Sequence, residues 1–274
     1  MTASIAPVPL SGSTRLTNVQ LAGLFDLSGK TAVVTGAAGV LGGFLAKGLA
    51  LYGADVCLTD VGLPGLASVA AEIESYGRRA ITVACDVTDD TGVQAMMDAA
   101  IAELGKIDIL VTCAGINSRD VAEVLPIEEF DRVMSVNVRG TFLCCQAAAR
   151  HMIGQGGGKI ITIGSVRGFV GSPSGSASYT TAKGAIHLLT KQLATEWAKY
   201  QINVNSIAPT VFRTPLTEDL LGDEEASRWV LSRIPWGRTA EVDDFLGAAI
   251  FLASAASDYV TGFILSVDGG CVAG

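Results

Sequence analysis

The sequence predicts one doubly wound α/β domain, with a parallel sheet of about seven strands and helices on both faces. A chain of 274 residues that is 49% hydrophobic can bury one large core. From Lys30 onward, short β-branched runs alternate with longer segments rich in Ala and Leu, as in β-α-β units. No internal repeat or low-complexity linker interrupts this alternation, so a single domain is the simplest interpretation.

The strands are expected where β-branched residues cluster, because these side chains favour extended backbone. The seven runs are residues 31–35, 55–59, 80–85, 107–112, 159–163, 202–207 and 264–267. Helical segments lie between successive runs, which makes neighbouring strands parallel. We expect the domain to span residues 28–274 and to follow a flexible N-terminal extension of residues 1–27.

Composition argues against several kinds of partner. Nineteen basic against 27 acidic residues give a net charge of -8, the wrong sign for binding nucleic acid. Six cysteines without a C-x-x-C pair and only two histidines indicate buried free thiols and no metal site. The longest apolar stretch without charges, residues 31–46, is too short to span a bilayer, so we expect a cytoplasmic protein that makes no membrane contact.

The first strand run is followed by a glycine turn at Gly36, Gly39 and Gly42. Without side chains there, backbone N–H groups and the next helix N-terminus can approach a pyrophosphate. Tight strand-to-helix packing without a ligand is the alternative.

Asp60 ends the second run, where a carboxylate can accept hydrogen bonds from ribose hydroxyls and repels a 2′-phosphate. No Lys or Arg adjoins either feature, which favours NAD over NADP; an ordinary solvated aspartate is the alternative.

A second cluster lies later in the chain, where Ser165 follows the fifth run and Tyr179 precedes Lys183 by four residues. Residues at this spacing share one helix face. A tyrosine with a pKa near 10 is a poor base, but an adjacent cation lowers its pKa. The pair is therefore suited to removing a proton from an alcohol while hydride leaves the carbon. An isolated Tyr-x-x-x-Lys is also consistent with an ordinary exposed helix pair.

In this order the motifs resemble those of the short-chain dehydrogenase/reductase family, over about residues 27–270. The resemblance rests on Gly36, Gly39, Gly42, Asp60, Asp86–Val87, Cys113–Ala114–Gly115, Asn137, Ser165, Tyr179, Lys183, Pro209 and Asp268–Gly270. It implies a Rossmann-type fold and an NAD-dependent enzyme that interconverts a secondary alcohol and a ketone. It also implies a homo-oligomer, with a tetramer favoured and a dimer possible, which fits the low charged content of 17%. His187, on the helix of Tyr179, is expected at a subunit interface.

The resemblance also implies roles for individual residues. Tyr179 would be the general acid/base, Lys183 would lower its pKa, Ser165 would bind the substrate oxygen, and Asn137 would hold a proton-relaying water. The cofactor would contact Gly36, Gly39, Val40, Leu41, Gly42, Asp60, Asp86, Val87, Cys113, Ala114, Gly115, Tyr179, Lys183, Pro209, Val211 and Thr214.

Four positions depart from the commoner family pattern. Val40 stands where that pattern has a glycine, and Cys113 replaces an asparagine that ties strands together. Thr210 replaces the glycine after Pro209, and Ser165 lies 14 residues before Tyr179 rather than 13. We interpret all four as variation within a working enzyme, because Asn137, Ser165, Tyr179 and Lys183 are all present.

Three arginines are candidates for substrate binding: Arg119, Arg167 and Arg213. Arginine binds carboxylates with two parallel hydrogen bonds, and the run around Ser165 resembles that of sugar-acid and polyol enzymes, so we expect a sugar acid, polyol or hydroxy acid. Ordinary salt bridges are the alternative for each arginine. A lid segment of residues 211–236 is rich in Phe, Leu and Trp, which keeps open a hydrophobic cyclic or aromatic alcohol or ketone. A non-catalytic NAD(H)-sensing protein is a third hypothesis.

Overall fold

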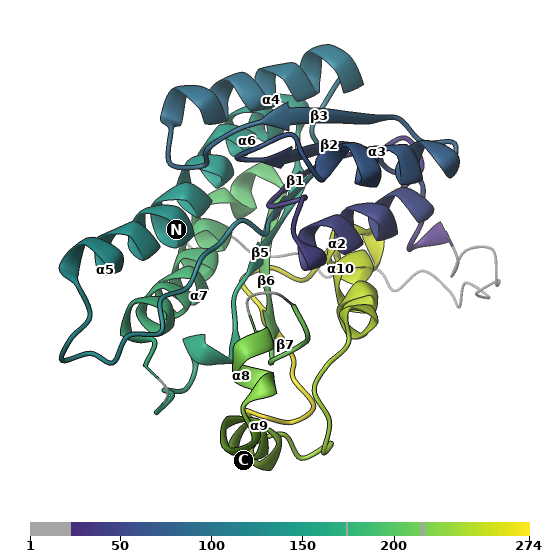
Figure 1. Cartoon of the computed structure of the whole chain (residues 1–274). Helices are drawn as coiled ribbons and strands as arrows, with labels where there is room; N and C mark the ends of the chain where they lie inside the picture. Colours follow the sequence, from purple (N-terminus) through teal and green to yellow (C-terminus); the bar gives the residue numbers. More distant parts are fainter. Residues whose placement is uncertain (1–22, 174, 215–216) are drawn as a thin grey trace, which may run out of the picture.

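The structure, a computed structural model, describes residues 23–173, 175–214 and 217–274. In this part of the chain seven parallel strands form one sheet in the order β3-β2-β1-β4-β5-β6-β7, which confirms the predicted fold class (Figure 1). The strands are β1 (Thr31–Thr35), β2 (Asp55–Asp60), β3 (Ala80–Ala84), β4 (Ile109–Thr112), β5 (Gly158–Ile163), β6 (Ile202–Pro209) and β7 (Ile264–Val267).

The strand predictions were accurate in number and wrong by up to two residues at the ends. The fourth run was expected from residue 107, but β4 begins at Ile109. The sixth was expected to end at residue 207, but β6 continues to Pro209 because its last residues pair with β7, in the register Pro209↔Val267. Such ends depend on the neighbouring strand and are not encoded locally.

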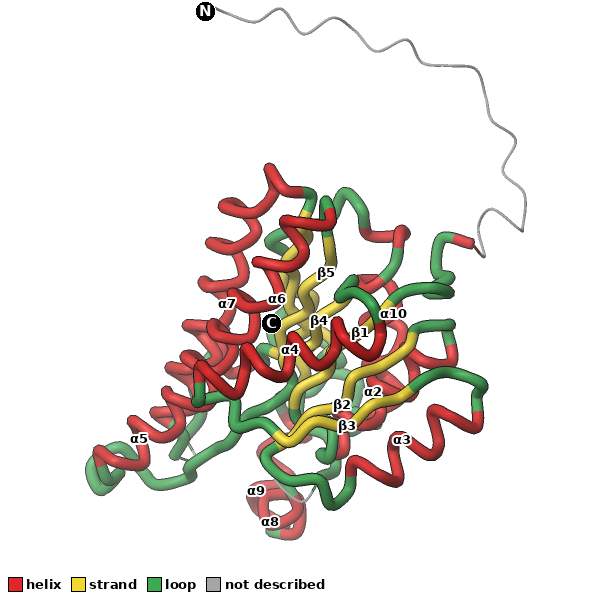
Figure 2. Tube along the Cα trace, turned by 90° about the horizontal axis from the view of Figure 1, so that it is seen from above, coloured by secondary structure: helices red, strands yellow, loops and turns green. Residues whose placement is uncertain are grey.

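Helices cover both faces of the sheet, and Figure 2 shows the two layers from above. The helices α2 (Val40–Leu51), α3 (Leu66–Ser75) and α10 (Leu246–Ala253) pack on one face, in a core cluster that includes Leu45, Leu49 and Phe245. The helices α4 (Asp90–Leu104), α6 (Thr141–Gln155) and α7 (Ala177–Trp197) pack on the other, in a cluster that includes Met96, Met97 and Cys144.

The remaining helices lie at the edges of these layers. α5 (Ile127–Met134) continues through a π-helical segment (Ser135–Gly140) into α6. α8 (Glu218–Gly222) and α9 (Glu224–Ser232) lie in the segment predicted to act as a lid. Short 3-10 helices cover Val166–Gly168, Ala198–Tyr200, Val242–Phe245 and Ala255–Ser257.

The order in which strands are added to the sheet reverses direction at β1, which pairs with β2 on one side and with β4 on the other. The connections from the carboxyl ends of β1 and β4 therefore leave toward opposite faces of the sheet. In doubly wound sheets such a switch point opens a crevice at the carboxyl ends of the strands. The predicted glycine turn follows β1, so it lies at this crevice.

The predicted N-terminal extension falls mostly on residues 1–22, outside the described residues. The residues just before β1 are already part of the packed domain. Leu27 is buried in the core, and its N–H donates to the Tyr52 carbonyl at 2.8 Å.

Two negative findings apply to the described ranges. None of their helices combines the length and the apolar character needed to cross a bilayer. No group of three or more His, Cys, Asp or Glu side chains in these ranges could hold a metal ion.

We predict that Gly42→Ala destabilises the fold strongly. A Cβ at residue 42 would lie 2.2 Å from the Gly36 carbonyl oxygen, and backbone cannot move aside as a flexible side chain can. We expect the free energy of unfolding in urea to fall by about 2 kcal/mol or more. Gly247→Ala is the matched control, since residue 247 is also helical and a Cβ there meets nothing within 4 Å. It should be neutral or slightly stabilising, and equal losses in both variants would contradict the prediction.

Candidate active site

One cavity of about 950 Å³ lies at the carboxyl ends of the strands and gathers nearly all of the predicted site residues. Among its lining residues are Gly36, Gly39, Val40, Leu41, Gly42, Asp60, Asp86, Val87, Cys113, Ala114, Gly115, Arg119, Ser165, Arg167, Tyr179, Lys183, Pro209, Val211 and Thr214. Asn137 and Arg213 are not among the residues that line it. The carboxyl ends of six strands, β1 to β6, and the segments that follow them thus meet in one place.

The glycine turn forms a cradle of bare backbone. Gly36 has a φ of +67°, and a Cβ there would lie 2.7 Å from the Ala114 nitrogen. Gly39 precedes α2 with extended backbone, and no side chain caps the helix. The first N–H groups of α2 have no partner within the helix, so this end accommodates a pyrophosphate. The geometry fits the dinucleotide predicted from the sequence.

Asp60 closes the cradle from the side of β2. Its carboxylate accepts the Ala38 N–H at 3.1 Å and the Val61 N–H at 2.8 Å, which fixes it between the glycine turn and the strand end. Among the described residues Asp60 makes no ion pair. Farther along the cavity wall, the Asp86 carboxylate accepts the backbone N–H and the hydroxyl of Thr88, at 2.9 and 2.8 Å. It thereby holds the turn that carries Val87.

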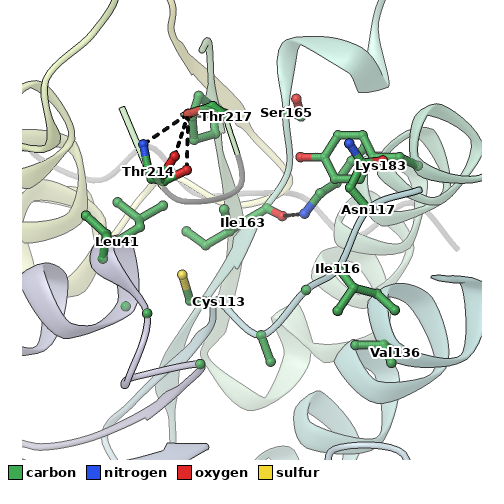
Figure 3. A pocket seen from close by; sticks show the side chains of 18 of the residues that line it. Leu41, Cys113, Ile116, Asn117, Val136, Ile163, Ser165, Lys183, Thr214 and Thr217 are labelled. Atoms are coloured by element: carbon green, nitrogen blue, oxygen red, sulfur yellow. Dashed lines mark hydrogen bonds between the residues drawn. The ribbon is translucent and has the colours of Figure 1, made fainter. Parts of the chain in front are cut away.

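At Cys113, hydrogen bonds of the backbone join β1 to the end of β4, and they do not depend on the side chain at residue 113. The Thr35 hydroxyl oxygen accepts the N–H groups of Cys113 and Ala114, at 3.1 and 3.2 Å. The thiol itself lies in the cavity (Figure 3), and burial raises its pKa to about 12. Cys113 is therefore a neutral, unreactive lining residue.

Ser165, Tyr179 and Lys183 come together where the sequence predicted. Ser165 follows β5 with extended backbone, and its Oγ accepts the Arg167 N–H at 3.1 Å. The Lys183 ammonium lies 5.4 Å from the centre of the Tyr179 ring, one helix turn away. It donates a hydrogen bond to the Ile163 carbonyl at 2.6 Å (Figure 3). This carbonyl fixes the buried ammonium beside the phenol.

The ionisation of this cluster differs from the simple expectation that Lys183 lowers the pKa of Tyr179. In the protein alone, burial raises the pKa of Tyr179, while the Ser165 hydroxyl and the Arg167 guanidinium act in the opposite direction. Burial also lowers the pKa of Lys183 to about 8. Neutral pH lies about one unit below that value, so the amine is still mostly protonated there and a positive charge remains beside the phenol.

Asn137 lies in the π-helical segment between α5 and α6 and is fully buried. Its side-chain oxygen accepts the Ile116 N–H at 2.8 Å, and its amide nitrogen donates to the Ile116 carbonyl at 2.9 Å. Gly115 lies between Asn137 and Lys183, since a Cβ on it would be 3.3 Å from the Asn137 oxygen and 4.0 Å from the Lys183 nitrogen. Asn137 therefore positions the segment after β4. π-helical turns often mark functional sites.

The three candidate arginines occupy different environments. Arg167 lines the cavity, partly desolvated, and its guanidinium lies 5.3 Å from the ring centre of Trp229. Arg119 is more exposed but also lines the cavity, and its backbone contacts the loop before α7, where a Cβ on Gly175 would lie 2.4 Å from the Arg119 carbonyl. Arg213 is exposed and is not among the lining residues, although its neighbours Phe212 and Thr214 are.

The prediction that His187 lies at a subunit interface was wrong. Its imidazole is buried beneath the turn that carries Ser165, and its Nε2 accepts the Ser165 N–H at 3.5 Å. Gly164 and Gly168 are required here, because a Cβ on either would lie within 2.4 Å of the ring. The spacing of Tyr179, Lys183 and His187, each one turn apart on one helix face, is the sequence signal that could have located it.

His187 predicts a pH dependence of stability. Burial, together with Lys183 and Lys191, lowers the pKa of His187 to about 4 from an ordinary value of 6.5. Below pH 6.5 His187 binds a proton in the unfolded chain but stays neutral in the folded one. The free energy of unfolding therefore falls as the pH drops toward 4. We expect this residue alone to remove about 2 kcal/mol between pH 7 and pH 5.

The measurement is urea unfolding of the wild type, His187→Gln and the partly exposed control His151→Gln at both pH values. Of the two variants, only His187→Gln should lose the fall of about 2 kcal/mol in the free energy of unfolding between pH 7 and pH 5. NMR titration of the two histidines in the wild type tests the same point without a variant. An imidazole of His187 that titrates near pH 6.5 would contradict the assignment.

Comparisons with known proteins agree with this geometry. A family model described as enoyl-(acyl carrier protein) reductase matches residues 36–272. Gluconate 5-dehydrogenase of Gluconobacter oxydans (strain 621H) is 44% identical over 247 residues, which are 90% of this chain and 96% of that protein. The 2-dehydro-3-deoxy-D-gluconate 5-dehydrogenase of Escherichia coli (strain K12) is 42% identical over 250 residues, which are 91% of this chain and 98% of that protein.

Solved structures give the same result. The gluconate 5-dehydrogenase of Burkholderia cenocepacia J2315, in complex with NADP and tartrate, superposes with a TM-score of 0.89 at 40% identity, covering 93% of this chain and 99% of that one. An NAD+-bound xylitol dehydrogenase superposes with a TM-score of 0.85 at 31% identity, covering 89% of this chain and 99% of that one. The chain therefore belongs to the short-chain dehydrogenase/reductase family, as an enzyme acting on CH–OH groups and a relative of the sugar-acid and polyol dehydrogenases.

Proposed function

We propose that the protein is an NAD-dependent dehydrogenase that interconverts a secondary alcohol and a ketone on a sugar acid, a polyol or a hydroxy acid. The observation that carries this proposal is the continuity of one cavity. It joins the glycine turn and Asp60 to Ser165, Tyr179 and Lys183, and it then reaches Arg167. Names of relatives point the same way, since they describe enzymes acting on gluconate, 2-dehydro-3-deoxy-D-gluconate and xylitol.

In the proposed reaction Tyr179 is the general acid/base. A bound nicotinamide ring supplies the acceptor for the hydride. The Ser165 hydroxyl donates a hydrogen bond to the substrate oxygen, and the Tyr179 oxygen takes the proton of the alcohol as the carbon is oxidised. Lys183, held by the Ile163 carbonyl, stabilises the phenolate. Asn137 keeps the segment after β4 in place beside this ammonium and, as proposed from the family resemblance, helps to hold a relaying water.

The choice of NAD over NADP rests on Asp60. Its carboxylate is fixed by two backbone N–H groups at the place where the adenosine ribose would lie, and Val61, exposed beside it, offers no cation for a 2′-phosphate. A fixed negative charge repels that phosphate and accepts hydrogen bonds from free ribose hydroxyls. The dinucleotide would also contact the turn of Asp86 and Val87, Cys113 to Gly115, and Pro209, Val211 and Thr214, all of which line the cavity.

A hydrophobic cyclic or aromatic alcohol or ketone is the second candidate substrate. Phe212, Leu220 and Trp229 line the lid side of the cavity and favour it. The guanidinium of Arg167 lies over the Trp229 ring, however, so this side of the cavity is not uniformly apolar. A purely NAD(H)-sensing protein is the weakest alternative, because it has no need of the complete cluster of Ser165, Tyr179 and Lys183.

We further propose a cytoplasmic homo-oligomer, a tetramer rather than a dimer, in which residues 28–274 form one domain. Helices α6 and α7 expose the large apolar side chains Phe142 and Leu188, which contacts between subunits would cover. All six cysteines are free thiols, as expected in a reducing compartment.

The first test is turnover of a substrate panel with NAD and, in parallel, with NADP, divided between sugar acids or polyols and hydrophobic secondary alcohols. We expect formation of NADH with the first group. Tyr179→Phe should lower kcat at least about 100-fold, because it removes the general base, and should still bind NADH. Tyr259→Phe, at a fully exposed position, is the control. Turnover confined to hydrophobic alcohols would favour the second candidate, and undiminished activity of Tyr179→Phe would refute the assignment of the base.

A second test concerns cofactor choice. Asp60→Ala removes the charge that repels a 2′-phosphate, so we expect the ratio of kcat/KM with NAD to that with NADP to fall roughly tenfold or more, about 1.4 kcal/mol. Asp243→Ala, a substitution at an exposed aspartate outside the cavity, should leave the ratio unchanged. An unchanged ratio in Asp60→Ala would mean that this carboxylate does not select the cofactor.

A further inference from the structure

We propose that Trp229 is a positioning residue that holds Arg167 in place to bind the carboxylate of an anionic substrate. This inference rests on the proposed function and deepens it, since it selects sugar acids over polyols as the preferred substrates. It also assigns a role to a residue of the lid segment for which the sequence offered only packing or a hydrophobic pocket.

The Arg167 side chain is held on two sides. Its Cζ lies 5.3 Å from the centre of the Trp229 ring, a distance typical of a cation–π contact. Its Nη1 donates to the Gly171 carbonyl at 2.6 Å, and its backbone N–H donates to the Ser165 hydroxyl oxygen at 3.1 Å. The guanidinium therefore has a defined orientation before any substrate binds.

These contacts leave one edge of the guanidinium open. Within the described ranges, Nε and Nη2 of Arg167 make no hydrogen bond to the protein, and no carboxylate lies within 4 Å of the guanidinium. This edge forms the paired hydrogen bonds of a bidentate arginine–carboxylate contact. Arg167 is moreover partly desolvated and close to a second cation, Arg233, and both effects lower its pKa. A cation in such surroundings gains from an anionic partner.

The position of Trp229 is fixed by the fold rather than by the ligand. Its neighbour in α9, Val230, is buried in a small cluster with Val166, Ile234 and Cys271. Val166 lies between Ser165 and Arg167, so this cluster attaches the lid helix directly to the turn that carries both. A substrate bound at one end by Arg167 is thereby placed relative to the Ser165 hydroxyl at its reacting end.

The test compares two substrates that differ only in the charged end, D-gluconate and D-glucitol, or another acid and polyol pair that the panel shows to be turned over. We expect Trp229→Leu to raise KM for the acid at least about tenfold with little change in kcat, and to change KM for the polyol less than about twofold. Trp229→Phe keeps an aromatic face and should restore most of the loss. Arg167→Met should show the same selectivity, and adding Trp229→Leu to it should have little further effect.

Trp236→Leu is the matched control, because Trp236 also lies near an arginine, Arg238 at 5.7 Å from the ring centre, but outside the cavity lining. Its KM values should not change. Equal changes of KM for acid and polyol in Trp229→Leu, or none for the acid, would overturn the inference and leave the proposed dehydrogenase function standing.

A binding measurement distinguishes failure of this inference from failure of the proposed dehydrogenase function. If the wild type turns over neither member of any acid and polyol pair, the proposed function fails. Calorimetric titration of D-gluconate into the wild type and into Arg167→Met then tests the carboxylate site by itself. Binding that is lost in the variant supports the inference, and absence of binding to the wild type overturns it.

Discussion

The site depends on how closely β1 and β4 approach each other at their carboxyl ends. Gly36 contacts the backbone of Ala114 so tightly that no side chain fits between them, and the Thr35 hydroxyl accepts two N–H groups from the start of the segment after β4. This contact sets the direction in which α2 begins and in which the segment after β4 leaves. Both segments line the cavity, so its wall on the side of β1 and β4 follows from this contact.

The second organising feature is the burial of positive charge in a protein whose net charge is -8. Lys183 is buried and satisfied by a backbone carbonyl, and Arg167 is partly desolvated between an aromatic ring and a carbonyl. Burial lowers the pKa of both cations. In the described part of the chain neither makes an ion pair with a carboxylate. Removing cations from water without an acidic partner costs stability. This arrangement fits the binding of anionic ligands that we propose for the cavity.

The turn between β5 and α7 connects these features. Two of its glycines, Gly164 and Gly168, leave room for the His187 imidazole, which lies beneath the Ser165 N–H. The same turn presents the Ser165 hydroxyl, carries Arg167 and packs Val166 against the lid helix. One short segment therefore joins the proposed catalytic serine, the proposed substrate-binding arginine and the contact with α9.

The sequence by itself determined the seven strands, the glycine turn, Asp60 and the Tyr179–Lys183 pair, because each depends on periodicity or on spacing within a few residues of the chain. It also placed Ser165 at the end of β5. Only the tertiary structure decided that Asn137 holds the backbone of Ile116, that His187 lies under the Ser165 turn and that Trp229 stacks on Arg167. It also separated Arg167, in the cavity lining, from Arg213, which is exposed outside it. These contacts join side chains far apart in the sequence, and local patterns do not specify which distant partners the packing of a sheet and its helices brings together.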